Sequence, residues 1–151
     1  MTVVYSKGFY QTCEKSDGTC SNGADNLFTI SGGPIMVTEF VGIVTTGIGS
    51  TVATLQIKEV PTEPAATTVN LSTAVAITSD AAGTSYTFTV ATPGVLTPTT
   101  AGCLDQVPAI RWLCPIGTIN ATGSAANSTG NIKWYIGYYM LSPYSKVEAA
   151  A

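Results

Sequence analysis

The stretch Ser85-Tyr86-Thr87-Phe88-Thr89-Val90 alternates small hydroxyl side chains with large apolar ones at every position. Successive side chains of a β-strand point to opposite faces, so Tyr86, Phe88 and Val90 share one face and the small hydroxyl groups share the other. Such a pattern predicts a strand that is buried on one face and hydrated on the other. It is the clearest local signal in the chain, and it indicates a β-rich fold.

A second alternating stretch runs from Thr51 to Val60, where Ala53, Leu55 and Ile57 are expected to point inward. No stretch sustains the apolar spacing of a helix. Further strand candidates lie between turns rich in glycine and proline: Leu27 to Ser31, Ile35 to Thr45, Ala74 to Thr78, Ala109 to Cys114 and Asn131 to Leu141, with Thr2 to Tyr5 as an additional one. Short strands without helices predict an all-β, single-domain β-sandwich, with a jelly roll as the expected variant.

The two ends of the chain differ from its middle. Residues 1–26 contain at most one short strand and a loop flanked by cysteines. Residues 142–151 contain Pro143, which prevents the continuation of a central strand. We therefore expect the β-sandwich to occupy residues 27–141, with an extended N-terminal arm and C-terminal tail. Such ends often fray, and in assemblies they can become ordered against a neighbour.

The four cysteines form two local pairs in the sequence, Cys13 with Cys20 and Cys103 with Cys114. Their spacing is wider than that of a typical zinc site, and the chain has no histidine. Local disulfides would each stabilise the fold by about 2.5–3 kcal/mol. Four reduced thiols are the alternative, and the sequence alone does not decide the connectivity.

The sequence contains no recognisable catalytic arrangement. Without histidine, a catalytic base would have to be a lysine or a carboxylate. Lys58 and Glu59 are adjacent on a strand and so point to opposite faces. Glu39, within an apolar strand, is the acid that we expect to be partly buried, in a paired or interface role. The acidic loop around Asp17 and Asp25 lacks the EF-hand spacing. We therefore expect no enzymatic activity, no catalytic residues, no cofactor and no metal.

The chain carries few charges, with 10% charged residues against about 25% in a typical soluble domain. Its lysines and arginines are scattered, and no apolar stretch approaches the roughly 20 residues that span a bilayer. We therefore expect neither nucleic acid nor a membrane as a partner. The low charge favours a surface packed against neighbours in an assembly. A secreted, hydroxyl-coated domain is the alternative, which the absence of a secretory apolar core in residues 1–11 disfavours.

Two strand candidates, 35–45 and 131–141, carry apolar side chains on both faces. Strands of this kind are covered on both faces, and tyrosine is favoured at the centres of interfaces. We predict as interface candidates the following side chains on these strands and in the tail: Tyr135, Tyr139, Leu141, Tyr144 and Phe40. The alternative is that the loop from Ala91 to Val107 folds over this face.

Several segments resemble a known group of proteins. They are Leu27-Phe28-Thr29-Ile30-Ser31-Gly32-Gly33-Pro34-Ile35 with the strand and turn that follow, Ala76-Ile77-Thr78-Ser79-Asp80-Ala81-Ala82-Gly83-Thr84, and Ile132-Lys133-Trp134-Tyr135 with the closing Leu141-Ser142-Pro143. Together they resemble the small β-rich virion structural proteins of tailed bacteriophages, which include head decoration or cement proteins. The likeness covers roughly residues 27 to 147 and consists of turn and strand patterns.

The resemblance implies a non-enzymatic capsid decoration protein on the exterior of the phage head, made in the host cytoplasm. Its implied partners are the major capsid protein, whose subunit contacts it would stabilise, and further copies of itself in a homo-oligomer, a trimer being one option. The alternative is a tail or fibre component that recognises the host surface. Trp112 and Trp134 would then be the first candidates for carbohydrate contacts, although both lie on apolar faces that suit core packing.

Overall fold

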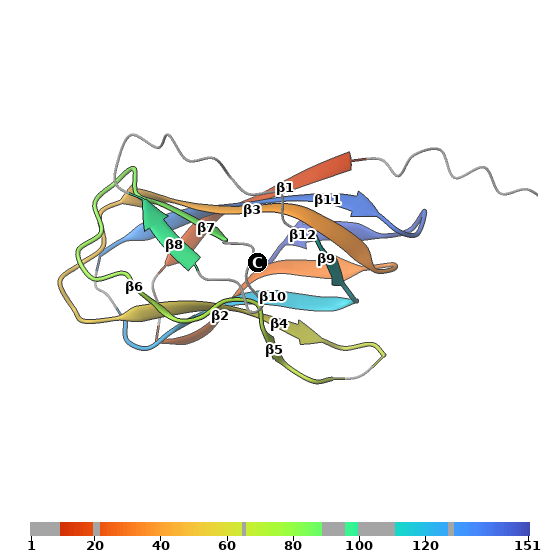
Figure 1. The fold of residues 1–151 in the computed structure, drawn as a ribbon, viewed down its shortest axis with the longest axis horizontal. Helices are drawn as coiled ribbons and strands as arrows, with labels where there is room; N and C mark the ends of the chain where they lie inside the picture. Colours follow the sequence, from red (N-terminus) through yellow and green to blue (C-terminus); the bar gives the residue numbers. More distant parts are fainter. Residues whose placement is uncertain (1–9, 20–21, 65, 89–95, 100–110, 127–128) are drawn as a thin grey trace, which may run out of the picture.

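Two antiparallel β-sheets are packed face to face in the computed structural model of this chain (Figure 1). The structure describes residues 10–19, 22–64, 66–88, 96–99, 111–126 and 129–151. These residues form strands, turns and loops without any helix, so the prediction of an all-β sandwich is confirmed. In the same ranges no helix is long and apolar enough to cross a membrane.

Each sheet has six strands (Figure 1). Sheet A has the order β1 (Tyr10–Thr19), β11 (Asn131–Met140), β3 (Ile35–Thr46), β7 (Ser85–Phe88) and β8 (Leu96–Thr99), and β9 (Trp112–Cys114) also pairs with β3. Sheet B has the order β12 (Lys146–Ala149), β2 (Gly23–Ser31), β10 (Gly117–Gly123), β4 (Thr54–Pro61) and β5 (Val69–Asn70), and β6 (Val75–Ala76) also pairs with β4.

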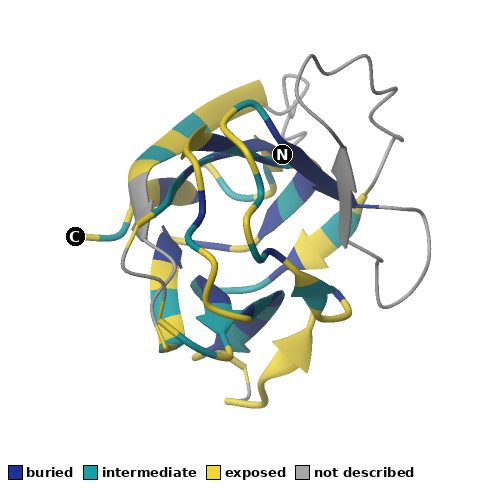
Figure 2. Cartoon of the chain, turned by 90° about the vertical axis from the view of Figure 1, so that its left-hand side faces the viewer, coloured by how far each residue is buried: buried dark blue, intermediate teal, exposed yellow. Residues whose placement is uncertain are grey.

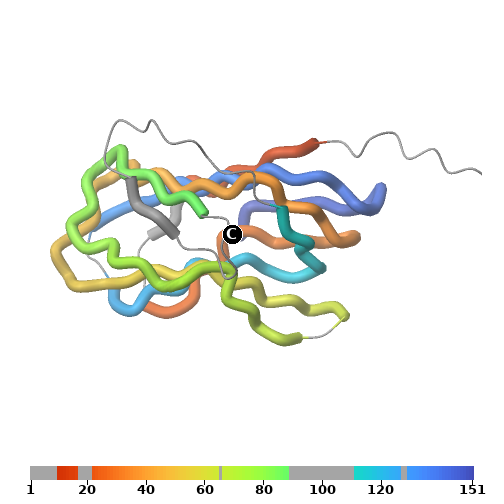
Figure 3. The backbone as a smooth tube through the Cα atoms, in the orientation of Figure 1, coloured from red at the N-terminus to blue at the C-terminus, as the bar shows by residue number. Residues whose placement is uncertain are grey.

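The strand pairs are nested along the chain. β1 pairs with β11, β2 with β10, β3 with β9 and β7, and β4 with β5 and β6, all antiparallel. The strands β1 to β4 alternate between the two sheets, which the backbone trace shows as two layers (Figure 3). β8 and β12 lie outside this nested set, since β8 pairs with β7 and β12 with β2.

The apolar core lies between the sheets, where the buried segments of the strands face each other (Figure 2). Leu55 and Ile57 of β4 are buried and Lys58 is not, which confirms the alternation predicted for that strand. Tyr86 and Phe88 of β7 are buried as predicted, but so are its hydroxyl residues, and the expected hydrated face is wrong. β7 lies between β3 and β8 in the interior of sheet A.

Phe40, which the sequence suggested as an interface residue, is fully buried at the centre of the core. Its ring centroid lies 5.4 Å from that of Trp134 and 5.5 Å from that of Phe88. The interface prediction is therefore wrong for this residue. The cause is a β-bulge, because Glu39 is paired with Gly137 while Val37 is paired with the next residue, Tyr138.

This bulge explains why the strand looks apolar on both faces in the sequence. A bulge adds one residue to a strand and shifts the alternation of side chains beyond it. Ile35 and Val37 before the bulge, and Phe40 and Val44 after it, all point into the core. Most of the apolar residues that the sequence placed on two faces of this strand therefore point into the core, because the bulge changes which positions face inward.

Several segments expected to be irregular form strands instead. In the presumed N-terminal arm, residues 10–19 form β1, and in the presumed tail residues 146–149 form β12. The expected loop from Ala91 to Val107 contains β8. The sequence patterns missed these strands because their residues are mostly polar or small. The candidate strand Thr2 to Tyr5 lies outside the described residues.

Candidate functional site: the outer face of sheet A

Four apolar or aromatic side chains form a continuous row across the outer face of sheet A. Tyr10 of β1 is paired with Tyr139 of β11, Tyr139 with Met36 of β3, and Met36 with Leu113 of β9. Residues directly opposite each other in a sheet project on the same face. The exposed fractions are 42% for Tyr10, 39% for Tyr139 and 59% for Leu113, and Met36 is half-buried. We call these four residues the apolar row.

The tyrosine end of the row is held in place by specific contacts. The rings of Tyr10 and Tyr139 meet edge to face, with centroids 5.6 Å apart. The Tyr10 hydroxyl donates a 2.6 Å hydrogen bond to Oε2 of Glu39 on β3. This bond to the carboxylate, followed by burial, raises the pKa of Tyr10 to about 12. The hydroxyl lies above Gly137, where a Cβ atom would overlap it.

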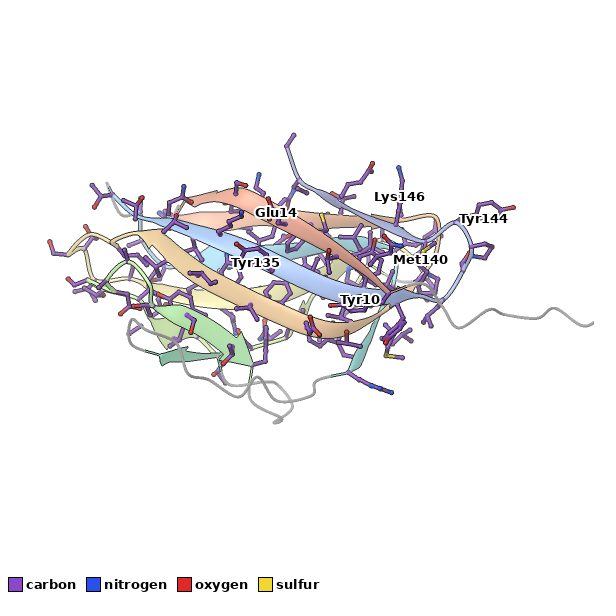
Figure 4. All side chains as sticks on the ribbon, turned by 90° about the horizontal axis from the view of Figure 1, so that it is seen from above. Tyr10, Glu14, Tyr135, Met140, Tyr144 and Lys146 are labelled. Carbon is purple, nitrogen blue, oxygen red and sulfur yellow. The ribbon has the colours of Figure 1, made fainter. Side chains whose placement is uncertain are left out.

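Glu14 of β1, which lies opposite Tyr135 of β11 in the sheet (Figure 4), carries the second carboxylate on this face and forms an ion pair there. Lys133 Nζ lies 3.1 Å from Oε2 of Glu14 and 5.2 Å from the ring centre of Tyr135. An exposed ion pair of this type contributes little to stability, because water and salt screen it. Glu39 is hydrogen-bonded to the neutral hydroxyl of Tyr10, which does not cancel its charge. A partner covering this face would therefore have to leave the Glu39 carboxylate in water or supply a cation for it.

The remaining interface candidates lie at the end of the row or beside it. Leu141 is 44% exposed and Tyr144 is 78% exposed, in the turn between β11 and β12 (Figure 4). Oγ of Ser145 fixes this turn by donating a 2.8 Å hydrogen bond to the carbonyl of Pro34. Tyr135 is half-buried under Lys133. Tyr139 near the end of β11, and Leu141 and Tyr144 in the turn that follows it, are thus all exposed.

Three members of the apolar row escaped the sequence analysis. Tyr10 was assigned to an arm, and Met36 and Leu113 lie in strands whose outward direction the sequence did not fix. Only the register of strand pairing shows that these three residues share one face, and that register cannot be read from a single sequence. The alternative cover for this face, the loop from Ala91 to Val107, lies mostly outside the described residues.

The free edge of sheet A is less suited to pairing with another chain than its face is. Lys15 of the edge strand β1 donates a 2.6 Å hydrogen bond from Nζ to the carbonyl of Ala150, across the side of the sandwich. A bulge interrupts β1 between Lys15 and Gly18. Inward-pointing charges and bulges are two devices that keep edge strands from pairing with other sheets. The apolar row is therefore the better candidate for contact with a partner.

The structure bears on the metal and disulfide predictions only within the described residues. In the described ranges no group of three or more Cys, Asp or Glu side chains could hold a metal ion. Cys13 and Cys114 have no disulfide partner among the described residues. Their predicted partners, Cys20 and Cys103, lie outside those ranges, so the two local disulfides stay predictions. Burial raises the pKa of Cys13.

The sequence predicted that Glu39 would be partly buried, and this prediction is wrong. Glu39 is exposed, because the bulge in β3 turns it outward. Glu59 is buried instead, with 6% of its surface exposed, on the inner face of β4. The signal was present in the sequence, since Glu59 is in phase with Leu55 and Ile57.

Neither tryptophan is placed as a platform for a carbohydrate. Trp134 is 1% exposed in the core. Trp112 is partly buried, with its ring centroid 5.6 Å from that of Phe88. Both side chains pack between the sheets, as the core interpretation of these residues anticipated.

Comparison with known proteins gives no independent indication of function. No protein-family model, curated protein or solved structure shows significant similarity to this chain. We therefore base the functional proposal on the composition of the sequence and the geometry of the outer face of sheet A.

Proposed function

We propose that this chain is a non-enzymatic structural protein of a virus particle, a decoration or cement protein that binds the exterior of a tailed-phage head. The observation that carries the proposal is the apolar row on the outer face of sheet A. Exposed apolar groups in contiguous patches mark sites of protein–protein contact. A partner with a cationic group opposite Glu39 could cover this face without leaving that carboxylate unpaired.

The order of the strands supports a jelly roll as the finer description of the fold. We infer the jelly roll from the sheet orders β1-β11-β3-β7 and β2-β10-β4-β5, together with the nested strand pairs. Jelly rolls are used by viral capsid proteins and by lectins. The fold alone does not define a function, so it adds weight only together with the apolar row and the sequence resemblance.

In this proposal the apolar row contacts the major capsid protein and stabilises the assembled shell. A ligand that binds only the assembled state favours that state by mass action. Many copies on one shell, or copies joined in a homo-oligomer, would strengthen the attachment without any single contact being strong. The low charge of the chain agrees with a surface that is partly covered in the particle.

The first test is the copy number of the protein in purified virions, measured by quantitative mass spectrometry against the major capsid protein. A copy number comparable to that of the shell protein is expected. A few copies per particle would contradict head decoration and favour a tail or fibre component.

The second test is binding of purified variants to particles that lack the protein. Leu113→Ser and Tyr139→Ser should each weaken binding by about tenfold, because removing a central apolar anchor costs about 1–2 kcal/mol. Val52→Ser is the matched control, since Val52 is 82% exposed and lies outside the apolar row. Equal binding by all three variants would contradict the proposed face.

A further inference from the structure

Glu59 places a carboxyl group in the apolar core. It lies on the inner face of β4, between Ile119 of β10 and Val69 of β5 in the sheet. Its Oε1 atom is buried without a hydrogen-bond partner. Burying an ionised carboxylate in such a site is costly unless it is paired, so the neutral acid is favoured there.

The inner face of β9 lies across from this carboxyl group. Cys114 is fully buried, and its thiol lies close enough to the Glu59 carboxyl group for each to affect the pKa of the other. Trp112, two residues earlier and thus on the same face of β9, has a buried Nε1 atom without a hydrogen-bond partner. These contacts join sheet B, through Glu59, to sheet A, through the pairing of β9 with β3.

The charges around Glu59 provide little compensation for its ionisation. Burial raises its pKa, and the hydrogen bond from Cys114 lowers it by a smaller amount. The flanking residues in the sheet are apolar, and Lys58 points to the opposite face of β4. Arg111, directly before β9, is exposed. Within the described residues, Cys114 is thus the titratable group that faces Glu59. The pKa of Cys114 is also raised, chiefly by burial.

β9 connects this buried cluster to the apolar row. It is a three-residue strand whose described pairing is with residues 35–37 of β3. Trp112 and Cys114 point inward from it, and Leu113 points outward next to Met36. A change that displaces β9 from the core would therefore remove Leu113 from the apolar row.

We propose that Glu59, Cys114 and Trp112 form a proton-sensitive latch that holds β9 against the core and Leu113 in the apolar row. When Glu59 is neutral, β9 remains packed against the core. When Glu59 ionises, β9 loosens so that water reaches the carboxylate. Only the role of Leu113 rests on the proposed function. The latch itself is a property of the isolated protein and does not depend on that function.

The sign of the pH dependence follows from linkage. A carboxyl group whose pKa is higher in the closed state than in the open state binds more protons when closed. The stabilisation of the closed state is complete at low pH and is lost as the pH rises through the pKa of the closed state. The latch is therefore closed in acid and loosens above the ordinary glutamate pKa of 4.5.

Amide hydrogen exchange of the isolated full chain, measured by NMR between pH 4 and pH 8 and corrected for intrinsic rates, tests the latch. Protection of the β9 amides should fall relative to that of β11 as the pH rises, by at most about tenfold per pH unit for one proton. Glu59→Gln should remove this dependence, and Glu63→Gln, which changes an exposed acid, should retain it. Constant protection of β9 in the unmodified protein, or a dependence that persists in Glu59→Gln, would overturn the proposal.

Cys114→Ala is a second variant that keeps Glu59 in place. Because the thiol hydrogen bond favours the ionised acid, its removal should move the loss of β9 protection to higher pH. A shift to lower pH would contradict the role of Cys114. Binding to particles separates the two proposals. Binding changes with pH only if the open state becomes well populated, so the row is judged by Leu113→Ser at one pH. Normal binding by Leu113→Ser together with pH-dependent β9 protection would leave the latch standing and reject the row as the docking surface.

Discussion

The hydroxyl of Tyr10 on β1 is hydrogen-bonded to the carboxylate of Glu39 on β3, across the strand that lies between them. The bond passes over Gly137 of β11, the position at which a side chain would block it. It joins three strands on the outer face of sheet A and fixes the ring of Tyr10 next to that of Tyr139. The edge strand β1 is thereby attached through its side chains as well as its backbone.

Gly137→Ala should disrupt this arrangement. The new methyl group would overlap the Tyr10 hydroxyl and approach Oε2 of Glu39, so both side chains must move. Because the clashing atoms belong to exposed side chains that can turn away, the main loss is the hydrogen bond between Tyr10 and Glu39, at a cost of about 0.5–1.5 kcal/mol. We expect a lower midpoint in urea denaturation and weaker particle binding. Gly47→Ala is the control, because a Cβ there has only ordinary contacts and should leave both quantities unchanged.

Glu39→Gln should lower the pKa of Tyr10 from about 12 toward its ordinary value of 10.0. The reason is that the hydrogen bond to the carboxylate favours the protonated phenol, and an amide oxygen accepts it more weakly. NMR titration of the Tyr10 ring measures the change. Since the pKa is raised in the folded state, the associated stabilisation is present at neutral pH and lost as the pH rises toward 12. An unchanged titration would contradict the hydrogen bond.

The sequence predicted the layers of this fold better than its register. The alternation in β4 and β7 identified buried positions such as Leu55 and Tyr86 correctly, because period two is a local property of a strand. Phe40 was misplaced because the bulge beside it depends on pairing with β11, which is distant in sequence. Tyr10 was missed for the same reason, since its strand is ordered by β11 and not by its own composition.

Tyr139→Ser and Phe40→Ala should separate assembly from folding. Tyr139 is exposed in the apolar row, so its replacement should change stability by about 1 kcal/mol or less and weaken binding to particles. Phe40 packs against several aromatic rings in the core, and its truncation should cost about 3–5 kcal/mol. Urea denaturation and particle binding measure the two effects. A large loss of stability in Tyr139→Ser with normal binding would refute the assignment of its role.

Deletion of residues 146–151 should destabilise the fold itself. Val147 is buried, and its backbone N–H donates a 3.2 Å hydrogen bond to the hydroxyl of Tyr138. The carbonyl of Ala150 accepts the hydrogen bond from Lys15. Losing these contacts and the pairing with β2 should cost at least about 2 kcal/mol. Deletion of residue 151 alone is the control, and equal thermal midpoints for the two deletions would show that β12 adds no stability.

Glu59→Gln should stabilise the protein at neutral pH. Removing an ionisable group that is buried without full pairing should raise the free energy of unfolding by about 1 kcal/mol at pH 7. The pKa of Glu59 is raised in the folded state, so the unmodified protein gains stability as the pH falls toward the unfolded pKa near 4.5. The advantage of the variant should therefore shrink at pH 4, as measured by urea denaturation at both pH values. An advantage that is the same at both would mean that Glu59 does not titrate differently in the folded chain, and its buried position would then have no consequence for pH.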